Sequence, residues 1–239
     1  MKHLLISFLL FTSVVANAQI GIGVSTANVN PSAQLEVLST NKGFLPPRMD
    51  STQRNAIISP AAGLTIYNTT LNAVQVYNGI VWYSTTHYIG ERYGGGIVFF
   101  VYDNGQHGLI ASTADQTTGI RWGSPRNIRA RGDGVGAGLK NTVIIISDQV
   151  DADNQAATVC NEYTVTVAGV TYGDWYLPSK HELNLLYLKK EVVGGFAANY
   201  YWSSNEFGEN DAWTQNFING DSGGRDKENT YNVRAVRAF

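Results

Sequence analysis

The first 18 residues have a different pattern from the rest of the 239-residue chain. An apolar run covers residues 4–15, with the basic Lys2 before it and the small-x-small triplet at residues 16–18 after it. This order is typical of a secretory signal peptide, and the run is too short for a permanent transmembrane helix. We therefore expect residues 1–18 to be a signal peptide and the exported chain to begin at Gln19.

Residues 19–87 contain few apolar side chains, and these alternate with polar ones. The alternation at 63–68 and 73–79 predicts short strands joined by Asn and Thr turns. Residues 51–58 fit one short helix, capped by Ser51 or Thr52. So thin a core is weak for a free-standing domain of this length. The pattern therefore predicts a β-rich stalk or assembly segment that packs against further copies, with a homotrimer as the suggested state.

From residue 88 to residue 239 the apolar runs are longer and include helical spacing. Asn104-Gly105 lies between two apolar runs, which predicts a hairpin. Ser179 followed by Glu182 matches a capping box at the start of an amphipathic helix. Further predicted elements are helices at 141–148 and 153–163, a hairpin at 163–172, strands at 200–204, 212–217 and 231–237, and loops at 119–139, 205–211 and 219–229. Strands in runs, with a few helices beside them, indicate an α+β fold.

Composition and charge narrow the function. Hydrophobic residues make up 44% of the chain and charged residues only 15%, which allows a sizeable core. The formal net charge is −2, so there is no basic excess to neutralise phosphates, and we expect no nucleic-acid partner. Cys160 is the single cysteine, and an internal disulfide is excluded. We interpret Cys160 as a buried apolar residue on a helix.

Four phrases in register carry a family resemblance: GDWYLPSKHEL, YYWSSNE, AWTQNF and YNVRAVRAF. They resemble the Lcl C-terminal-like domain, over about residues 88–239. The resemblance implies a C-type-lectin-like fold and adhesion-type binding of glycans or proteins, without catalysis. Further upstream, the phrases GFLPPRM and GLxxYN…VYNGxxW resemble N-terminal modules of bacterial surface and phage tail-fibre-like proteins, which implies a trimeric stalk or collar.

The strand predicted at residues 212–218 has two faces. Trp213, Gln215 and Phe217 share one face, which we assign to the interior because bulky aromatic residues favour burial. The other face and the flanking loops then offer polar groups and an exposed aromatic ring, as binding loops on a rigid scaffold do. The predicted ligand-binding residues are Asn205, Phe207, Glu209, Asn210, Asp211, Thr214, Asn216, Asp221 and Arg225.

Other chemistry finds little support in the sequence. The four histidines show no metal-ligand spacing, and Glu209-Asn210-Asp211 is interpreted as solvated carboxylates rather than a calcium site. No serine lies in a nucleophile elbow, so we predict no enzyme, no metal and no cofactor. Arg131-Gly132-Asp133 spells an integrin-type tripeptide that recurs by chance. Arg234 and Arg237 are expected to pair with acids such as Glu182 or Asp174.

Three functions are consistent with this sequence. The first is a secreted or outer-surface, adhesin-like protein that binds a glycan or an extracellular protein through its C-terminal loops. The second is a structural component of a trimeric fibre, with the lectin-like domain as its cap. The third is a variable ligand-binding protein of a diversity-generating retroelement: framework aromatics alternate with Asn, Ser, Gly, Asp and Thr up to the C-terminus, and this pattern resembles such variable proteins.

Overall fold

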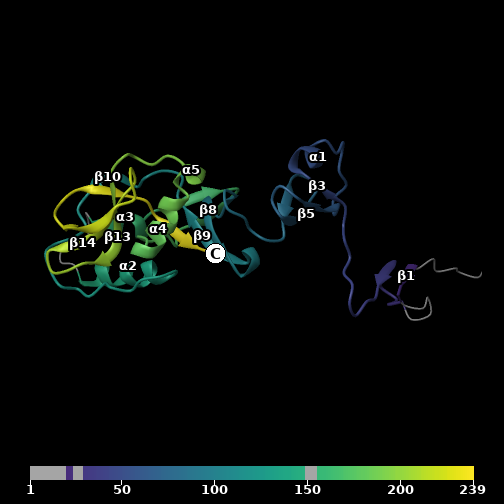
Figure 1. The fold of residues 1–239 in the computed structure, drawn as a ribbon, viewed down its shortest axis with the longest axis horizontal. Coiled ribbons are helices and arrows are strands. Elements are labelled where there is room, and N and C mark those ends of the chain that lie inside the picture. Colours follow the sequence, from purple (N-terminus) through teal and green to yellow (C-terminus); the bar gives the residue numbers. More distant parts are fainter. Residues whose placement is uncertain (1–19, 24–28, 149–154) are drawn as a thin grey trace, which may run out of the picture.

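The computed structural model describes residues 20–23, 29–148 and 155–239 (Figure 1). The predicted signal peptide therefore lies outside the described residues. The chain forms an N-terminal segment up to about residue 87 and a larger C-terminal domain after it. None of the described helices is long and apolar enough to cross a membrane.

The N-terminal segment holds a small β-structure with one short helix. Its elements are β1 (Ile20–Ile22), β2 (Leu35–Val37), β3 (Arg48–Met49), α1 (Ser51–Asn55), β4 (Thr65–Asn68), β5 (Ala73–Tyr77) and β6 (Trp82–Ser84). β1 and β2 form a parallel pair, and the other strands form a sheet in the order β3-β4-β5-β6. The alternation in the sequence thus predicted β4 and β5 correctly, because each pairs antiparallel with its neighbour.

The cap of α1 lies one residue earlier than predicted. Asp50, rather than Ser51 or Thr52, accepts the hydrogen bond from Gln53 N at 2.8 Å. The Gln53 side chain accepts in return from Asp50 N at 2.9 Å, which completes a capping box. A carboxylate at this position also interacts well with the helix dipole, so Asp50 is the better cap.

The core of the N-terminal segment is small, as predicted. Its fully buried apolar side chains, among the described residues, are Val29, Ile66 and Ala73. By contrast, large apolar side chains are exposed here: Ile58 to 92%, Ile80 to 83%, and Phe44 and Leu45 to 72% each. An unpartnered set of apolar side chains of this kind indicates an interaction surface.

The C-terminal domain is built on two sheets with helices packed around them, which confirms the α+β prediction (Figure 1). One sheet has the order β17-β9-β8-β7, the other β10-β16-β13-β14-β15. Its strands are β7 (Arg92–Tyr93), β8 (Gly96–Tyr102), β9 (His107–Ala111), β10 (Thr117–Ile120), β13 (Tyr200–Glu206), β14 (Asp211–Asn216), β15 (Ser222–Asp226), β16 (Tyr231–Val233) and β17 (Val236–Ala238). The remaining elements are η2 (Asp103–Gly105), α2 (Ala137–Asp148), α3 (Ala156–Asn161), the hairpin β11 (Val165–Val167) and β12 (Val170–Tyr172), α4 (Lys180–Leu188) and α5 (Lys190–Val193).

Buried tryptophans join the layers of this domain. Trp122 Nε1 donates to Ser203 O at 2.8 Å, and Trp202 Nε1 donates to Ile120 O at 2.9 Å. Each ring thus fills the core while its one polar atom is satisfied. Cys160 is also fully buried, on α3 as predicted, and burial raises the pKa of its thiol far above the ordinary value. It is therefore an inert core residue.

Several sequence boundaries were wrong. The strand predicted at 231–237 is two strands, β16 and β17, in different sheets. The strand is interrupted at Arg234. The buried guanidinium of this residue donates to Asp115 at 2.7 Å and to Gly195 O at 2.5 Å. The predicted loop at 219–229 contains β15, and the loop at 119–139 ends early because α2 begins at Ala137.

The two C-terminal arginines pair with acids, but only one pair was predicted. Arg237 donates to both oxygens of Asp174, at 2.6 and 2.9 Å. Arg234 pairs with Asp115 instead of the predicted acids. Glu182 serves another purpose: its carboxylate accepts from Ser179 N, Gly136 N and the Tyr176 hydroxyl.

Candidate functional site

Three adjacent strands, β13, β14 and β15, present nearly all the predicted ligand-binding residues. They pair antiparallel, with Trp213 opposite Gly224 and Gln215 opposite Ser222. Alternate side chains therefore point to opposite faces of this layer. One face packs against α4, and the other carries Trp202 and Ala212 into the core. The sequence predicted a buried Trp213 and an exposed Thr214. Both predictions were wrong, because Trp213 is only partly buried and Thr214 is buried.

Trp213 lies on the α4 side, but its ring is only partly buried, contrary to the prediction. Phe207 packs edge-on against it with 5.0 Å between ring centres and is 53% exposed. A cavity of about 340 Å³ opens beside the indole. The residues that line it are Asp133, Lys180, His181, Asn184, Trp213, Gln215, Gly220 and Ser222. We call this cavity the Trp213 pocket.

The wall of the Trp213 pocket formed by α4 is held by three caps from separate segments. Ser179 Oγ accepts from Glu182 N at 3.2 Å, Asp133 Oδ1 from His181 N at 2.9 Å, and Asn205 Oδ1 from Lys180 N at 2.7 Å. The first three N–H groups of the helix are thus all satisfied by side chains. This fixes where Lys180 and His181 enter the pocket.

Asn205 was predicted to bind a ligand from an exposed loop, but the structure places it in a buried position. It is only 5% exposed, and both ends of its amide are used. Its oxygen caps Lys180 N, and its Nδ2 donates to Gly132 O at 2.8 Å. A side chain in this position serves the loop–helix junction instead of contacting solvent.

Asp133 and Lys180 place opposite charges at the pocket. Lys180 Nζ lies 3.3 Å from Asp133 Oδ2 and 4.6 Å from the centre of the Trp213 ring. Partial burial opposes ionisation of Asp133, but the N–H groups of His181 and Gly134 and the Lys180 ammonium outweigh it and hold the pKa of this carboxyl below its ordinary value. The Arg131-Gly132-Asp133 triplet thus has its acid engaged in capping a helix.

The opposite face carries Asn216 and Arg225 beside two tyrosines. Arg225 Nη2 donates to the Tyr200 hydroxyl at 3.0 Å, and the Tyr200 and Tyr231 rings lie 5.4 Å apart. The hydrogen bond from Arg225 lowers the pKa of the Tyr200 phenol. This is a flat and partly exposed patch of aromatic rings with one cation. Such a patch is typical of protein contact surfaces.

Thr214 lies on the same side but is 1% exposed, so its predicted ligand role was wrong. Its hydroxyl donates to Gly223 O at 3.1 Å, across the pair of β14 with β15. Thr214 is also the strand partner of Trp202, so both side chains lie on the face of the sheet that enters the core. Tertiary packing over the strand, and not the strand's own alternation, decides this burial.

The remaining predicted residues lie at the ends of the strands, away from one another. Glu209 and Asn210 lie in the turn between β13 and β14, and Asp211 begins β14, where its carbonyl oxygen accepts from Phe207 N at 2.9 Å. Asp221 belongs to the turn between β14 and β15 and accepts from Asn219 Nδ2 at 2.6 Å. These side chains therefore do not converge on one site. Within the described residues no group of three or more His, Cys, Asp or Glu side chains is placed to hold a metal ion.

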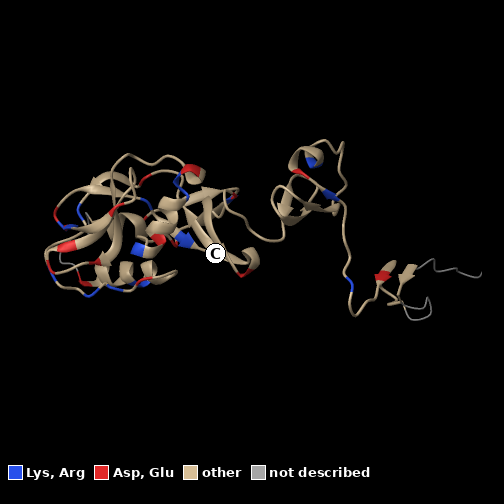
Figure 2. Ribbon diagram, in the orientation of Figure 1, with Lys and Arg blue, Asp and Glu red and all other residues tan. Residues whose placement is uncertain are grey.

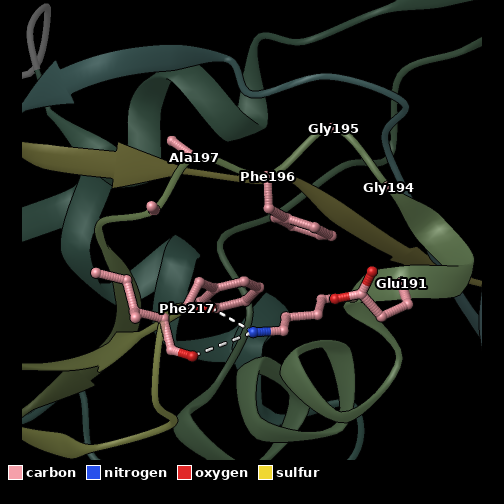
Figure 3. A pocket seen from close by; sticks show the side chains of 9 residues that line it. Glu191, Gly194, Gly195, Phe196, Ala197 and Phe217 are labelled. Atoms are coloured by element: carbon pink, nitrogen blue, oxygen red, sulfur yellow. Dashed lines mark hydrogen bonds between the residues drawn. The ribbon is translucent and has the colours of Figure 1, made fainter.

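A second pocket, of about 320 Å³, lies between α5 and the end of β14 (Figure 3). Gly194, Gly195 and Ala197 form much of its wall, with the Phe196 ring inside. The cation at this pocket is the Lys190 ammonium. It is already engaged within the protein, because Lys190 Nζ donates to Phe217 O at 2.6 Å (Figure 3). The Trp213 pocket offers more polar side chains and is therefore the stronger candidate.

Most residues of the Trp213 pocket were not predicted from the sequence. Asp133, Lys180, Asn184 and Ser222 come from three segments far apart in the chain. Only one local signal was present, since the capping box at Ser179 places Lys180, His181 and Asn184 on the first turns of α4. That Trp213 and Ser222 would face this helix depended on packing between layers.

The fold and the site together define an α+β domain with a polar pocket beside an aromatic ring. A β-rich segment with a small core precedes this domain in the chain. Residues 111–237, more than half of the chain, match the model of the Lcl C-terminal domain, and the chain belongs to this family. Residues 21–99 match the phage tail like trimerisation region. A comparison with curated proteins found no significant match. The two family matches indicate a surface or fibre-like protein.

Proposed function

We propose that this chain is an exported, non-enzymatic binding protein of the bacterial outer surface or a secreted fibre. Its N-terminal segment assembles the chain into a homotrimer, and its C-terminal domain recognises an extracellular glycan or protein. The match of residues 21–99 to a trimerisation region and the exposed apolar side chains of that segment support the assembly. A C-type-lectin-like arrangement, implied by the sequence resemblance, is part of this proposal.

The observation that carries the recognition function is the Trp213 pocket. A partly exposed indole, the exposed Phe207 ring and several polar side chains lie together where β14 and β15 meet the first turns of α4. Binding sites combine in this way an apolar surface with a few placed hydrogen-bonding groups. A trimer would present three such pockets, so that weak single contacts add up through avidity.

The charge distribution is compatible with such a role. Acidic and basic residues are interspersed along the described ribbon, with no extended region of one sign (Figure 2). Recognition would then depend on local contacts and not on a long-range field.

The test is a screen of the purified full chain on an array of glycans and extracellular-matrix proteins, with and without calcium. A variant with Phe207→Ala and Arg225→Ala alters both faces of the layer at partly exposed positions. We expect binding to a defined set of ligands, lost in this variant, while its circular dichroism stays unchanged. An array without any bound ligand would contradict the recognition function.

A second function is favoured by one observation, the trimerisation-region match. The chain would then be a structural fibre component, with the C-terminal domain as a cap. Assembly into trimers together with silence on every array would support this function over recognition.

A further inference from the structure

The Trp213 pocket has unused hydrogen-bonding capacity. Asn184 Oδ1 accepts from Gln215 Nε2 at 3.0 Å, which leaves Asn184 Nδ2 and Gln215 Oε1 without a partner among the described residues. The exposed Ser222 hydroxyl likewise has no partner in the described part of the chain. Gln215 is only 3% exposed, so its amide is held in place by its surroundings. The pocket thus presents a donor from Asn184, a buried acceptor from Gln215 and the hydroxyl of Ser222.

The apolar part of the pocket is the Trp213 indole. The ring is positioned by Phe207 on one side and by Lys180, 4.6 Å from its centre, on another. An aromatic surface next to placed donors and acceptors suits a sugar ring, because its C–H groups stack on the indole and its hydroxyls hydrogen-bond at the edge. The volume of about 340 Å³ lies in the lower part of the range for small-ligand sites.

The charges of the pocket indicate that this sugar is neutral. The Lys180 ammonium is paired with the Asp133 carboxylate at 3.3 Å. Neither charge is therefore free for a sulfate, a carboxylate or an amine of a ligand. Arg225 is the arginine of this layer and has no carboxylate partner within the described residues. It lies on the opposite face.

From these observations we infer that the Trp213 pocket binds a neutral sugar residue of a glycan, with Trp213 as the stacking surface and Asn184, Gln215 and Ser222 as hydrogen-bonding partners. This inference rests on the proposed recognition function and assigns its ligand class and its place. Glu209, Asn210, Asp211 and Asp221 have no part in it.

The test compares immobilised polysaccharides of two kinds with the full-length chain. The neutral probes are mannan, dextran and galactan, and the anionic probes are heparin and chondroitin sulfate. Ser222→Phe fills the pocket from an exposed position without removing a hydrogen bond, and Trp213→Ala removes the stacking surface. Glu228→Gln, at an exposed position in the turn between β15 and β16, is the matched control.

We expect binding to at least one neutral polymer, weakened at least about tenfold by each pocket variant and changed less than about twofold by Glu228→Gln. A thermal melt of each variant separates a filled pocket from an unfolded domain, and Ser222→Phe keeps the test valid if Trp213→Ala does not fold. Binding only to heparin or chondroitin sulfate, or only to a matrix protein, would overturn this inference and leave the proposed function standing. If the chain binds none of the polysaccharides and none of the proteins, both this inference and the proposed recognition function are overturned.

Discussion

Lys227 Nζ donates to Glu206 Oε1 at 2.9 Å, and both side chains are fully buried. Glu206 also accepts from the N–H groups of Ile128 and Arg129, each at 2.9 Å. Lys227 donates further to Arg126 O and Glu209 O. One buried ion pair therefore ties the loop around residues 121–131 to the strands that form the Trp213 pocket.

Removal of one partner of this pair should strongly destabilise the domain. Lys227→Met removes the buried counter-ion of Glu206 and leaves only the exposed Arg131, 3.6 Å from the carboxylate, so we expect a loss of about 3–5 kcal/mol in the free energy of unfolding. Urea unfolding followed by tryptophan fluorescence measures it. The double variant Lys227→Met/Glu206→Met should recover part of the loss, because no buried charge of this pair then remains. The exposed Lys140→Met serves as the control; a loss of similar size there would contradict this assignment.

Asn205 should matter for stability and not for direct ligand contact. Asn205→Ala removes the cap of Lys180 N and leaves Gly132 O without its donor. We expect a loss of about 1–3 kcal/mol in the free energy of unfolding, measured by chemical denaturation. Asn210→Ala, at an exposed turn position, should change it by less than about 0.5 kcal/mol. Equal stability of the two variants would show that the cap is unimportant.

Local features of this fold could be predicted from the sequence. The capping box at Ser179 and the hairpin at Asn104-Gly105 need only a few neighbouring residues, and both occur in the structure, the hairpin turn as the 3-10 element η2. The division of 231–237 into two strands could not be predicted, because it depends on Arg234 reaching Asp115, 119 residues away in the chain. β15 was missed because its Ser-Gly-Gly start resembles a loop.

The site was predicted only in part for a related reason. Alternation along residues 211–216 separates two faces but does not tell which of them another layer covers more completely. Thr214 is buried on the face that carries Trp202 into the core, while α4 leaves Trp213 partly open. Phe207, Asn216 and Arg225 were correctly placed at the surface or near it, on opposite faces. The pocket itself depends on Asp133 and α4, which no local pattern connects to β14.

The C-terminal domain should lose stability in acid through two carboxylates. Burial opposes the charged form of Asp174, yet the Arg237 guanidinium outweighs it and holds the pKa of this carboxyl below its ordinary value, and Asp133 is shifted in the same direction. A lowered pKa in the folded state means that the stabilisation is complete above about pH 4 and is lost as the pH falls through the folded value. Both side chains are substantially exposed, so the effect is modest.

This dependence can be measured with Asp174→Asn. Its urea midpoint should lie below that of the parent chain at pH 6, and the difference should narrow as the pH falls below about 4, because the unfolded chain then binds a proton at this carboxyl before the folded one does. Asp103→Asn, at a carboxylate whose contact with His107 is 3.9 Å long, is the control. A difference between Asp174→Asn and the parent that stays constant down to pH 3 would argue that the ion pair is not its cause.

The exposed apolar side chains of the N-terminal segment should hold the homotrimer together. Ile58 and Ile80 are 92% and 83% exposed in the single chain, and their burial between copies would provide about 1.5–3 kcal/mol per side chain. The double variant Ile58→Asp/Ile80→Asp should therefore dissociate the assembly to monomers at micromolar concentration, as measured by analytical ultracentrifugation. Val143→Asp, at a 56% exposed position of α2, should leave the trimer intact. Dissociation by the α2 variant, or a trimer that survives the double variant, would place the interface elsewhere.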